Sequence, residues 1–149
     1  MGIKLYLISE HLLPLHRVGD SDFDTYNMIV QSVENNGDLW SDISISPADL
    51  VNALKAIDTE LGSTRLLPVL AFNNSPHNIL GNTPKTPALG YFNPEQARDL
   101  DRSFNNLTPD AIDDLENEGP AVADVLYAFQ SAADQAAQTN EGIVVVHGR

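Results

Sequence analysis

The chain has 149 residues, 42% of them hydrophobic, which predicts one globular domain spanning residues 1–149 around a single core. Its 21 acidic residues and eight Lys or Arg residues give a formal net charge of -13, which excludes nucleic acid as a partner because phosphate binding needs clustered basic side chains. Cysteine is absent, which excludes disulfides and zinc–thiolate sites, and no apolar run is long enough to cross a membrane, so we expect a cytoplasmic protein.

The N-terminal part of the chain predicts a strand followed by two helices. Residues 3–8 form a short run of β-branched and aromatic side chains, which favours a strand. Asp22 can cap a helix that Gly37 ends. Ser46 precedes a proline, an order typical of the first turn of a helix, and Gly62 is expected to end this second helix.

The middle of the chain predicts an edge strand, a long loop and another short strand. Residues 65–72 are mainly apolar, but Pro68 lacks the amide hydrogen that a central strand needs, so this strand is expected at an edge or a bulge. Residues 73–88 are rich in proline and asparagine and predict a loop longer than compact domains usually contain. Residues 89–92 follow as a short strand.

The C-terminal part repeats one helix-start pattern and ends in a strand. Asn93 and Thr108 each precede a proline, an arrangement typical of the first turn of a helix. Apolar residues at helical spacing after Pro120 predict the longest helix, which stops at Asn140. Residues 143–146 (Ile-Val-Val-Val) show no polar alternation, which predicts a central strand buried on both faces.

Together these elements predict an α+β fold. We expect a small mixed or antiparallel sheet in which the N- and C-terminal strands pair, covered by four to five helices. Strands at both ends of the chain, with helices between them, are the basis of this prediction.

One part of the chain resembles a known family. The segment Leu89-Gly90-Tyr91-Phe92-Asn93-Pro94-Glu95-Gln96-Ala97, then Leu107-Thr108-Pro109 and the closing Gly142-Ile143-Val144-Val145-Val146, is similar to the C-terminal half of the YfbM-like bacterial proteins of unknown function. In that family a Tyr-x-Thr/Asn-Pro-Glu helix start, a short helix, a long helix and a hydrophobic strand follow in this order. The resemblance implies an α+β fold and no assigned activity, so no catalytic residue is carried over.

Acidic residues dominate the last third of the chain. No Lys or Arg occurs from Ser103 to Gly148, and this stretch contains a cluster made of Asp110, Asp113, Asp114, Glu116 and Glu118. The resulting negative potential would attract a basic protein partner and repel an anionic membrane. The alternative is that the charge serves solubility alone.

Two further candidate contact sites lie outside this cluster. Trp40, the only tryptophan, stands between Asp38 and Asp42. A lone tryptophan is usually a core residue, but an exposed one rimmed by acids is a candidate anchor for a basic partner. In the long loop, His77 and Asn78 supply uncharged donors and acceptors for a protein or a ligand, unless the loop is only a connector.

The sequence lacks the common motifs for catalysis and metal binding. The sequence contains no nucleophile elbow, no glycine-rich phosphate loop and no zinc-helix motif. The acids that start at Asp20 do not form a calcium loop, because its sixth position is Thr25 and its twelfth is Gln31. His11 and His16 do not share a helix face as paired metal ligands would. We therefore expect no cofactor and no metal.

The sequence favours a binding protein over an enzyme. Its most concrete prediction is an acidic immunity or inhibitor protein, monomeric or homodimeric, that neutralises a basic toxin or nuclease by covering its active cleft. Two alternatives stay open. One is a small hydrolase or transferase that uses His77 or His147 with a carboxylate, and the other is a self-associating structural or regulatory protein.

Overall fold

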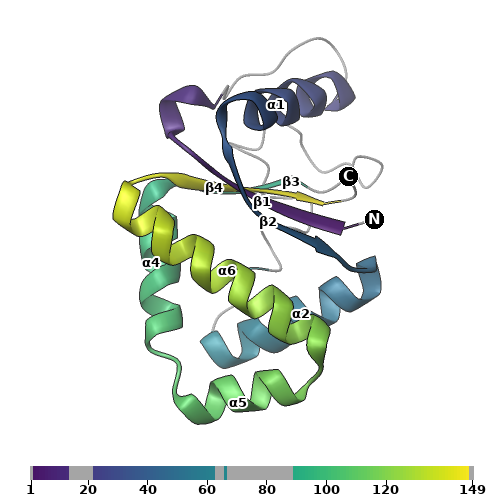
Figure 1. Ribbon diagram of the computed structural model, residues 1–149, viewed down its shortest axis with the longest axis vertical. Helices are drawn as coiled ribbons and strands as arrows, with labels where there is room; N and C mark the ends of the chain where they lie inside the picture. The colour runs from purple at the N-terminus through teal and green to yellow at the C-terminus, as the bar shows by residue number, and fades with distance from the viewer. Residues whose placement is uncertain (1, 14–21, 63–65, 67–88, 148–149) are drawn as a thin grey trace.

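A four-stranded antiparallel sheet forms the centre of the fold (Figure 1), in a computed structural model that describes residues 2–13, 22–62, 66 and 89–147. The strands are β1 (Gly2–Ile8), β2 (Asp38–Ser44), β3 (Leu89–Phe92) and β4 (Gly142–His147), in the order β2-β1-β4-β3. The N- and C-terminal strands pair with each other along their length, from Ile3 opposite His147 to Ile8 opposite Gly142. The predicted α+β fold and the pairing of the two terminal strands are confirmed.

Helices cover both faces of this sheet (Figure 1). Of the described helices, α1 (Asp22–Asn36) alone lies on one face. On the opposite face lie α2 (Pro47–Leu61), α4 (Pro94–Asn105) and α6 (Pro120–Thr139). The fifth helix, α5 (Pro109–Asn117), packs on α6 and α2 at the end farthest from the sheet, and a short 3-10 turn (Glu10–Leu12) follows β1.

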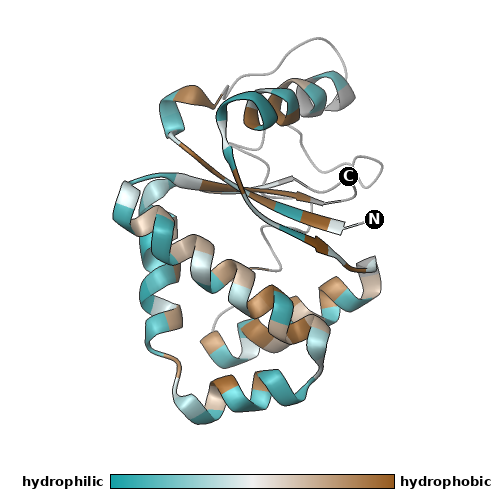
Figure 2. Ribbon diagram, viewed as in Figure 1, coloured by the Kyte–Doolittle hydropathy of each residue, from teal (hydrophilic) through white to brown (hydrophobic). Residues whose placement is uncertain are grey.

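The alternation of side chains in the strands produces two hydrophobic clusters. Ile3, Leu5 and Leu7 of β1 join the cluster formed with α2, α4, α5 and α6, whereas Tyr6 and Ile8 face α1. All of these residues are buried, so β1 is covered on both faces. Figure 2 shows apolar residues running along the strands, while α5 is largely polar.

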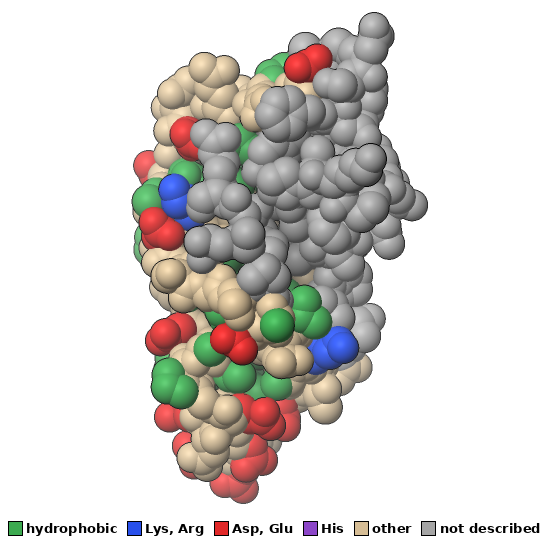
Figure 3. Space-filling model, turned by 90° about the vertical axis from the view of Figure 1, so that its right-hand side faces the viewer, with side chains coloured by type: hydrophobic (Ala, Val, Ile, Leu, Met, Phe, Trp, Pro, Cys, Tyr) green, Lys and Arg blue, Asp and Glu red, His purple; other side chains and the backbone are tan. Residues whose placement is uncertain are grey.

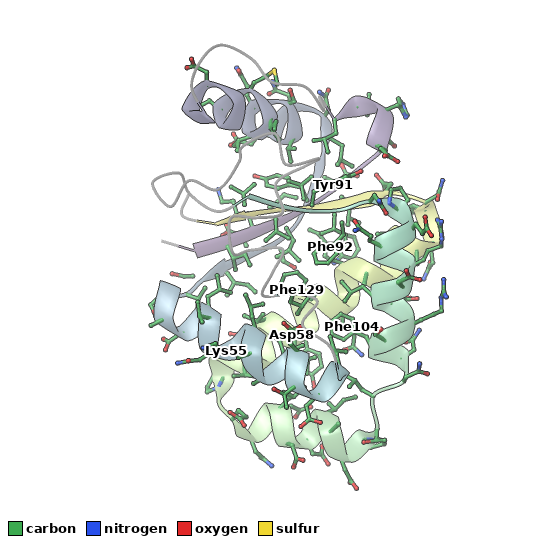
Figure 4. All side chains as sticks on the ribbon, turned by 180° about the vertical axis from the view of Figure 1, so that it is seen from behind. Lys55, Asp58, Tyr91, Phe92, Phe104 and Phe129 are labelled. Carbon is green, nitrogen blue, oxygen red and sulfur yellow. The ribbon has the colours of Figure 1, made fainter. Side chains whose placement is uncertain are left out.

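The last strand is buried on both faces, as its unbroken apolar run predicts. Ile143 and Val145 belong to the cluster on the α6 side, and Val144 and Val146 belong to the cluster on the α1 side. Figure 4 shows the same division in β3, where Tyr91 and Phe92 lie on opposite sides of the sheet.

Local capping signals set most of the helix boundaries. The side chain of Ser46 accepts a hydrogen bond from the Asp49 amide at 3.2 Å, and Asn93 and Gln96 form a reciprocal capping box. At the third start, the Thr108 hydroxyl accepts from the Ala111 amide at 3.1 Å. These three predicted helix starts are confirmed.

The described helices also end where the sequence places their ends. Gly62 closes α2 with φ 72°, a conformation that glycine adopts without strain. Asn140 closes α6 with φ 56°, which asparagine tolerates better than most residues. Asp22 differs slightly from its predicted role, since it is the first residue of α1 rather than the residue before it.

Several other predictions concern residues 63–88, of which the structure describes only Leu66. Only Leu66 of the predicted strand at 65–72 is described, and the predicted loop at 73–88 lies outside the described residues. Leu66 is buried, and its amide donates to the buried carboxylate of Asp58 at 2.9 Å. This hydrogen bond ties the chain beyond α2 back to that helix. Strand β2 was not predicted.

Candidate functional site

An open groove of about 850 Å³ lies between β2 and α6. One wall is formed by residues 39–44 of β2, and the other by Asp124, Tyr127, Ala128 and Ser131 of α6. Alternate residues of a strand point to opposite faces of a sheet. Because consecutive residues from Leu39 to Ser44 all line this space, it follows the edge of β2 rather than one face. We call it the β2–α6 groove.

A β-bulge sets the position of Trp40 in the groove. Leu5 of β1 pairs with Ser41 and Tyr6 pairs with Leu39, so Trp40 is the extra residue on β2. A bulge of this kind redirects side chains at the edge of a sheet. The indole Nε1 of Trp40 donates to the Ser131 hydroxyl at 2.9 Å, and 39% of the residue is exposed. The indole is therefore held against α6 while part of it remains open to solvent.

Tyr127 is the second exposed aromatic residue of the groove, and it connects the groove to α5. It is 47% exposed, and its hydroxyl donates to a carboxylate oxygen of Glu116 on α5. The hydrogen bond to Glu116 raises the pKa of Tyr127, with smaller contributions from partial burial and from the charges of Glu116 and Asp113. Ionisation would place a phenolate beside these carboxylates, so Tyr127 stays neutral and continues to donate.

We expect the Glu116→Gln substitution to lower the pKa of Tyr127 towards that of an ordinary tyrosine. The amide side chain can still accept the hydrogen bond, but it no longer opposes a negative charge on the phenol. The measurement is an absorbance titration of tyrosinate, with Tyr127→Phe identifying the contribution of this residue. A Tyr127 titration that Glu116→Gln leaves unmoved would show that the two side chains are not in contact in solution.

A second, smaller hollow of about 480 Å³ adjoins the groove. It is lined by Asp101 and Asn105 of α4 and by Gln130 and Asp134 of α6, and it shares Tyr127 and Ser131 with the groove. Burial raises the pKa of Asp101, and the negative charge of Asp134 raises it further. A cationic side chain placed between these two carboxylates would stabilise their charged forms. The hollow is therefore suited to a Lys or Arg side chain.

Three elements at or beside the groove, β2, α5 and α6, carry acids and no basic residue. Two acids lie on β2, four on α5 and two on α6, and none of these three elements contains Lys or Arg. Figure 3 shows carboxylates gathered at the α5 end of one face. Other acids occur on α1 and α2, so the surface is acidic in several places, but Lys55 lies on α2 and Arg98 and Arg102 on α4.

The predicted site residues divide into three groups. Trp40 and Asp42 line the groove, and Asp113 and Glu116 act on Tyr127 at its α5 side. The second group is exposed but outside the groove lining: Asp38 on β2, Asp110 and Asp114 on α5, and Glu118 directly after α5. The third group, His77 and Asn78, lies outside the described residues, as does the side chain of His147.

Sequence reasoning missed the α6 wall of the groove. Asp124, Tyr127 and Ser131 come from the polar side of a helix that the sequence identifies by its apolar side. One signal was present, because Tyr127 is an aromatic residue outside the apolar stripe that runs through Val125, Leu126 and Phe129. Tyrosine is enriched at interfaces, because its ring is apolar and its hydroxyl group is polar.

Comparison of the chain with protein-family models, with curated proteins and with solved structures gives no match. The resemblance to YfbM-like proteins therefore stays a prediction. Within the described ranges, no three His, Asp or Glu side chains are placed to hold a metal ion, and no helix has the length and apolar character to span a bilayer. The fold and the groove define an acidic α+β domain with an aromatic, strand-lined groove.

Proposed function

We propose that this chain is an acidic protein-binding domain whose β2–α6 groove binds a basic segment of another protein. The observation that carries the proposal is the exposed Trp40, held by Ser131 in a groove whose charged lining residues are Asp42 and Asp124. Tryptophan and tyrosine are the residues most often found to dominate binding energy at protein interfaces. Carboxylates around them favour a partner that presents Lys or Arg.

The most concrete form of this function is that of an immunity or inhibitor protein. A toxin or nuclease that acts on phosphate groups needs clustered basic side chains in its cleft. The acids of β2, α5 and α6, with no Lys or Arg among them, offer such a cleft a competing negative surface. Self-association through this surface is unfavourable because a second copy would bring the same charges. The histidine-based enzyme stays an untested alternative, because His77 and the side chain of His147 lie outside the described residues.

The test uses Trp40 as the reporter, since it is the only tryptophan. Peptides are selected on the immobilised chain from a displayed library of random linear sequences, and selected peptides are then titrated against the chain in solution. We expect them to be enriched in Lys and Arg, and their binding to change the fluorescence of Trp40. We also expect binding to weaken as salt concentration rises, because exposed charges are screened.

Paired variants locate the binding site. Asp124→Asn with Asp134→Asn removes two charges from the groove and the adjoining hollow, and we expect about a tenfold loss of affinity, since two exposed charge pairs contribute on the order of 1 kcal/mol or slightly more. Glu60→Gln with Glu95→Gln removes the same charge from α2 and α4 and should change affinity little. The proposal fails if the selected peptides show no basic enrichment, or if the control pair weakens binding as much as the groove pair.

The inhibitor role has its own measurement. Once a basic protein partner has been identified by cross-linking from the groove, its activity is assayed as the chain is added. We expect activity to fall to background at one equivalent of the chain. Full activity of the partner at saturating chain would reject inhibition and leave binding alone.

A further inference from the structure

We propose that the basic segment binds as an added β-strand on the outer edge of β2. This inference rests on the proposed function and specifies how the groove holds its partner. In β-strand addition, main-chain hydrogen bonds supply affinity and alternate side chains supply specificity. Three features of the described structure support this mode: the open edge, the length of the groove and the charges beside it.

Strand β2 stands at the end of the sheet. It pairs with β1 from Gly2 opposite Ser44 to Leu7 opposite Asp38, and within the described residues no other strand pairs with it. An end strand presents one row of main-chain N–H and C=O groups to whatever lies beyond it. What lies beyond β2 here is the groove, because residues 39–44 line it without a break.

The groove has the length of a strand. Six consecutive residues of β2 line it, and at about 3.3 Å per residue they span about 20 Å, which is the usual length of a strand in a sheet. Helix α6 forms the second wall along the same edge, with Tyr127 and Ser131 one turn apart. The bulge at Trp40 interrupts this edge, so an extended segment would pair with residues 41–44 of β2 and contact α6 at the same time.

Charge decides which strand can occupy this edge. Strand β2 contains two exposed acids, Asp38 and Asp42, and no basic residue, and Asp124 stands on the facing helix. A second copy of β2 would bring two more carboxylates, of which only Asp42 has a basic cross-strand partner, Lys4. Like charges on neighbouring strands destabilise pairing. Lys or Arg side chains on an incoming strand would instead be paired with these acids. The edge is thus protected from pairing with itself and open to a basic strand.

The two faces of an added strand would meet different surroundings. Cross-strand neighbours share a face of the sheet, so Asp42 lies on the side of its partner Lys4, whereas Trp40 turns to Ser131 on the α6 side. Alternate residues of the incoming segment would therefore reach Trp40, Tyr127 and Asp124. A long side chain among these alternate residues of the incoming segment would extend past Tyr127 and reach the hollow of Asp101 and Asp134. Apolar and basic side chains are expected at these positions.

The test uses a synthetic end-blocked peptide of alternating Lys and Val and two N-methylated forms of it. One form carries backbone methyl groups on every Val, the other on every Lys, so that each blocks one edge of the extended peptide while its charge is unchanged. An added strand hydrogen-bonds through only one edge. We expect one methylated form to bind within about threefold of the parent peptide and the other to lose at least tenfold.

Amide hydrogen exchange gives a second readout. On addition of the parent peptide we expect the amides of β2 to exchange more slowly, whereas those of β3, at the opposite end of the sheet, serve as the control and stay unchanged. Equal binding of the two methylated forms, or unchanged exchange in β2, would overturn strand addition while leaving a basic partner in the groove. Failure of the parent peptide to bind, or an affinity that Asp124→Asn with Asp134→Asn leaves unchanged, would overturn the proposed function itself.

Discussion

Substitution of Phe129 by alanine is expected to lower the free energy of unfolding by about 3–5 kcal/mol, which is the usual cost of removing a fully buried phenylalanine side chain. Phe129 is 1% exposed and lies on α6, where it faces the sheet and contacts Phe92 of β3. The two rings meet edge to face, with centroids 6.4 Å apart and planes at 75°. Figure 4 shows Phe92, Phe104 and Phe129 on the same side of the sheet. The measurement is urea unfolding followed by circular dichroism.

Tyr127→Phe is the matched control for this substitution. It changes an exposed aromatic residue two positions away on the same helix and should alter stability by no more than about 0.5 kcal/mol. A loss below about 1 kcal/mol for Phe129→Ala would mean that neighbouring side chains fill the cavity left by the ring, and that the packing of Phe129 between α6 and the sheet contributes little to stability.

Tyr91→Phe is expected to remove a loss of stability that the native chain undergoes at alkaline pH. Burial raises the pKa of Tyr91 to about 12, and the charge of Glu10 adds to the effect. The ring lies so close to Gly142 that a Cβ there would be 2.9 Å from its Cε1 atom. Among the described residues, the Tyr91 hydroxyl has no hydrogen-bond partner. The folded state therefore disfavours the ionised form of Tyr91.

The sign of the pH dependence follows from this raised pKa. Below pH 10 the residue is neutral in both the folded and the unfolded chain, so it contributes no pH dependence. As pH rises from about 10 through about 12, the unfolded chain releases this proton first and stability falls, by on the order of 2–3 kcal/mol once the folded pKa is passed. Phenylalanine has no proton to lose.

The measurement compares urea unfolding of the native chain and of Tyr91→Phe at several alkaline pH values. Because the other tyrosines are common to both proteins, their titration cancels in the difference. At neutral pH the variant should be at least as stable as the native chain, since it removes a buried polar group without a partner. A difference between the two proteins that stays constant from pH 8 to pH 12 would contradict the buried, unpaired state of the hydroxyl.

Much of the fold could be predicted because its signals are local. Ser46, Asn93 and Thr108 cap the helices that follow them, and a capping side chain and its amide partner are only three residues apart. The buried strand β4 was equally readable, because an unbroken apolar run is a property of the segment itself.

Strand β2 could not be predicted from such local signals. Its sequence, Asp-Leu-Trp-Ser-Asp-Ile-Ser, has exposed or half-exposed side chains throughout and no clean alternation, because it lies at the end of the sheet and contains a bulge. It is a strand because β1 pairs with it, and this pairing depends on tertiary structure. The sequence did identify Trp40 and Asp42 as candidate contact residues, and both lie in the β2 wall of the groove. The other wall depends on the contact with Ser131, which is 91 residues away in the sequence.

The pairing of β1 with β4 has a consequence for how the chain acquires its structure. Ile3 of β1 pairs with His147 of β4, so the middle of the sheet cannot close until β4 has left the ribosome. Contacts between such distant segments slow folding, because the intervening chain must lose conformational entropy before the two segments can meet. Until then β1 exposes two apolar faces that the finished protein covers. Nascent β1 is thus the segment that a chaperone would be expected to shield during translation.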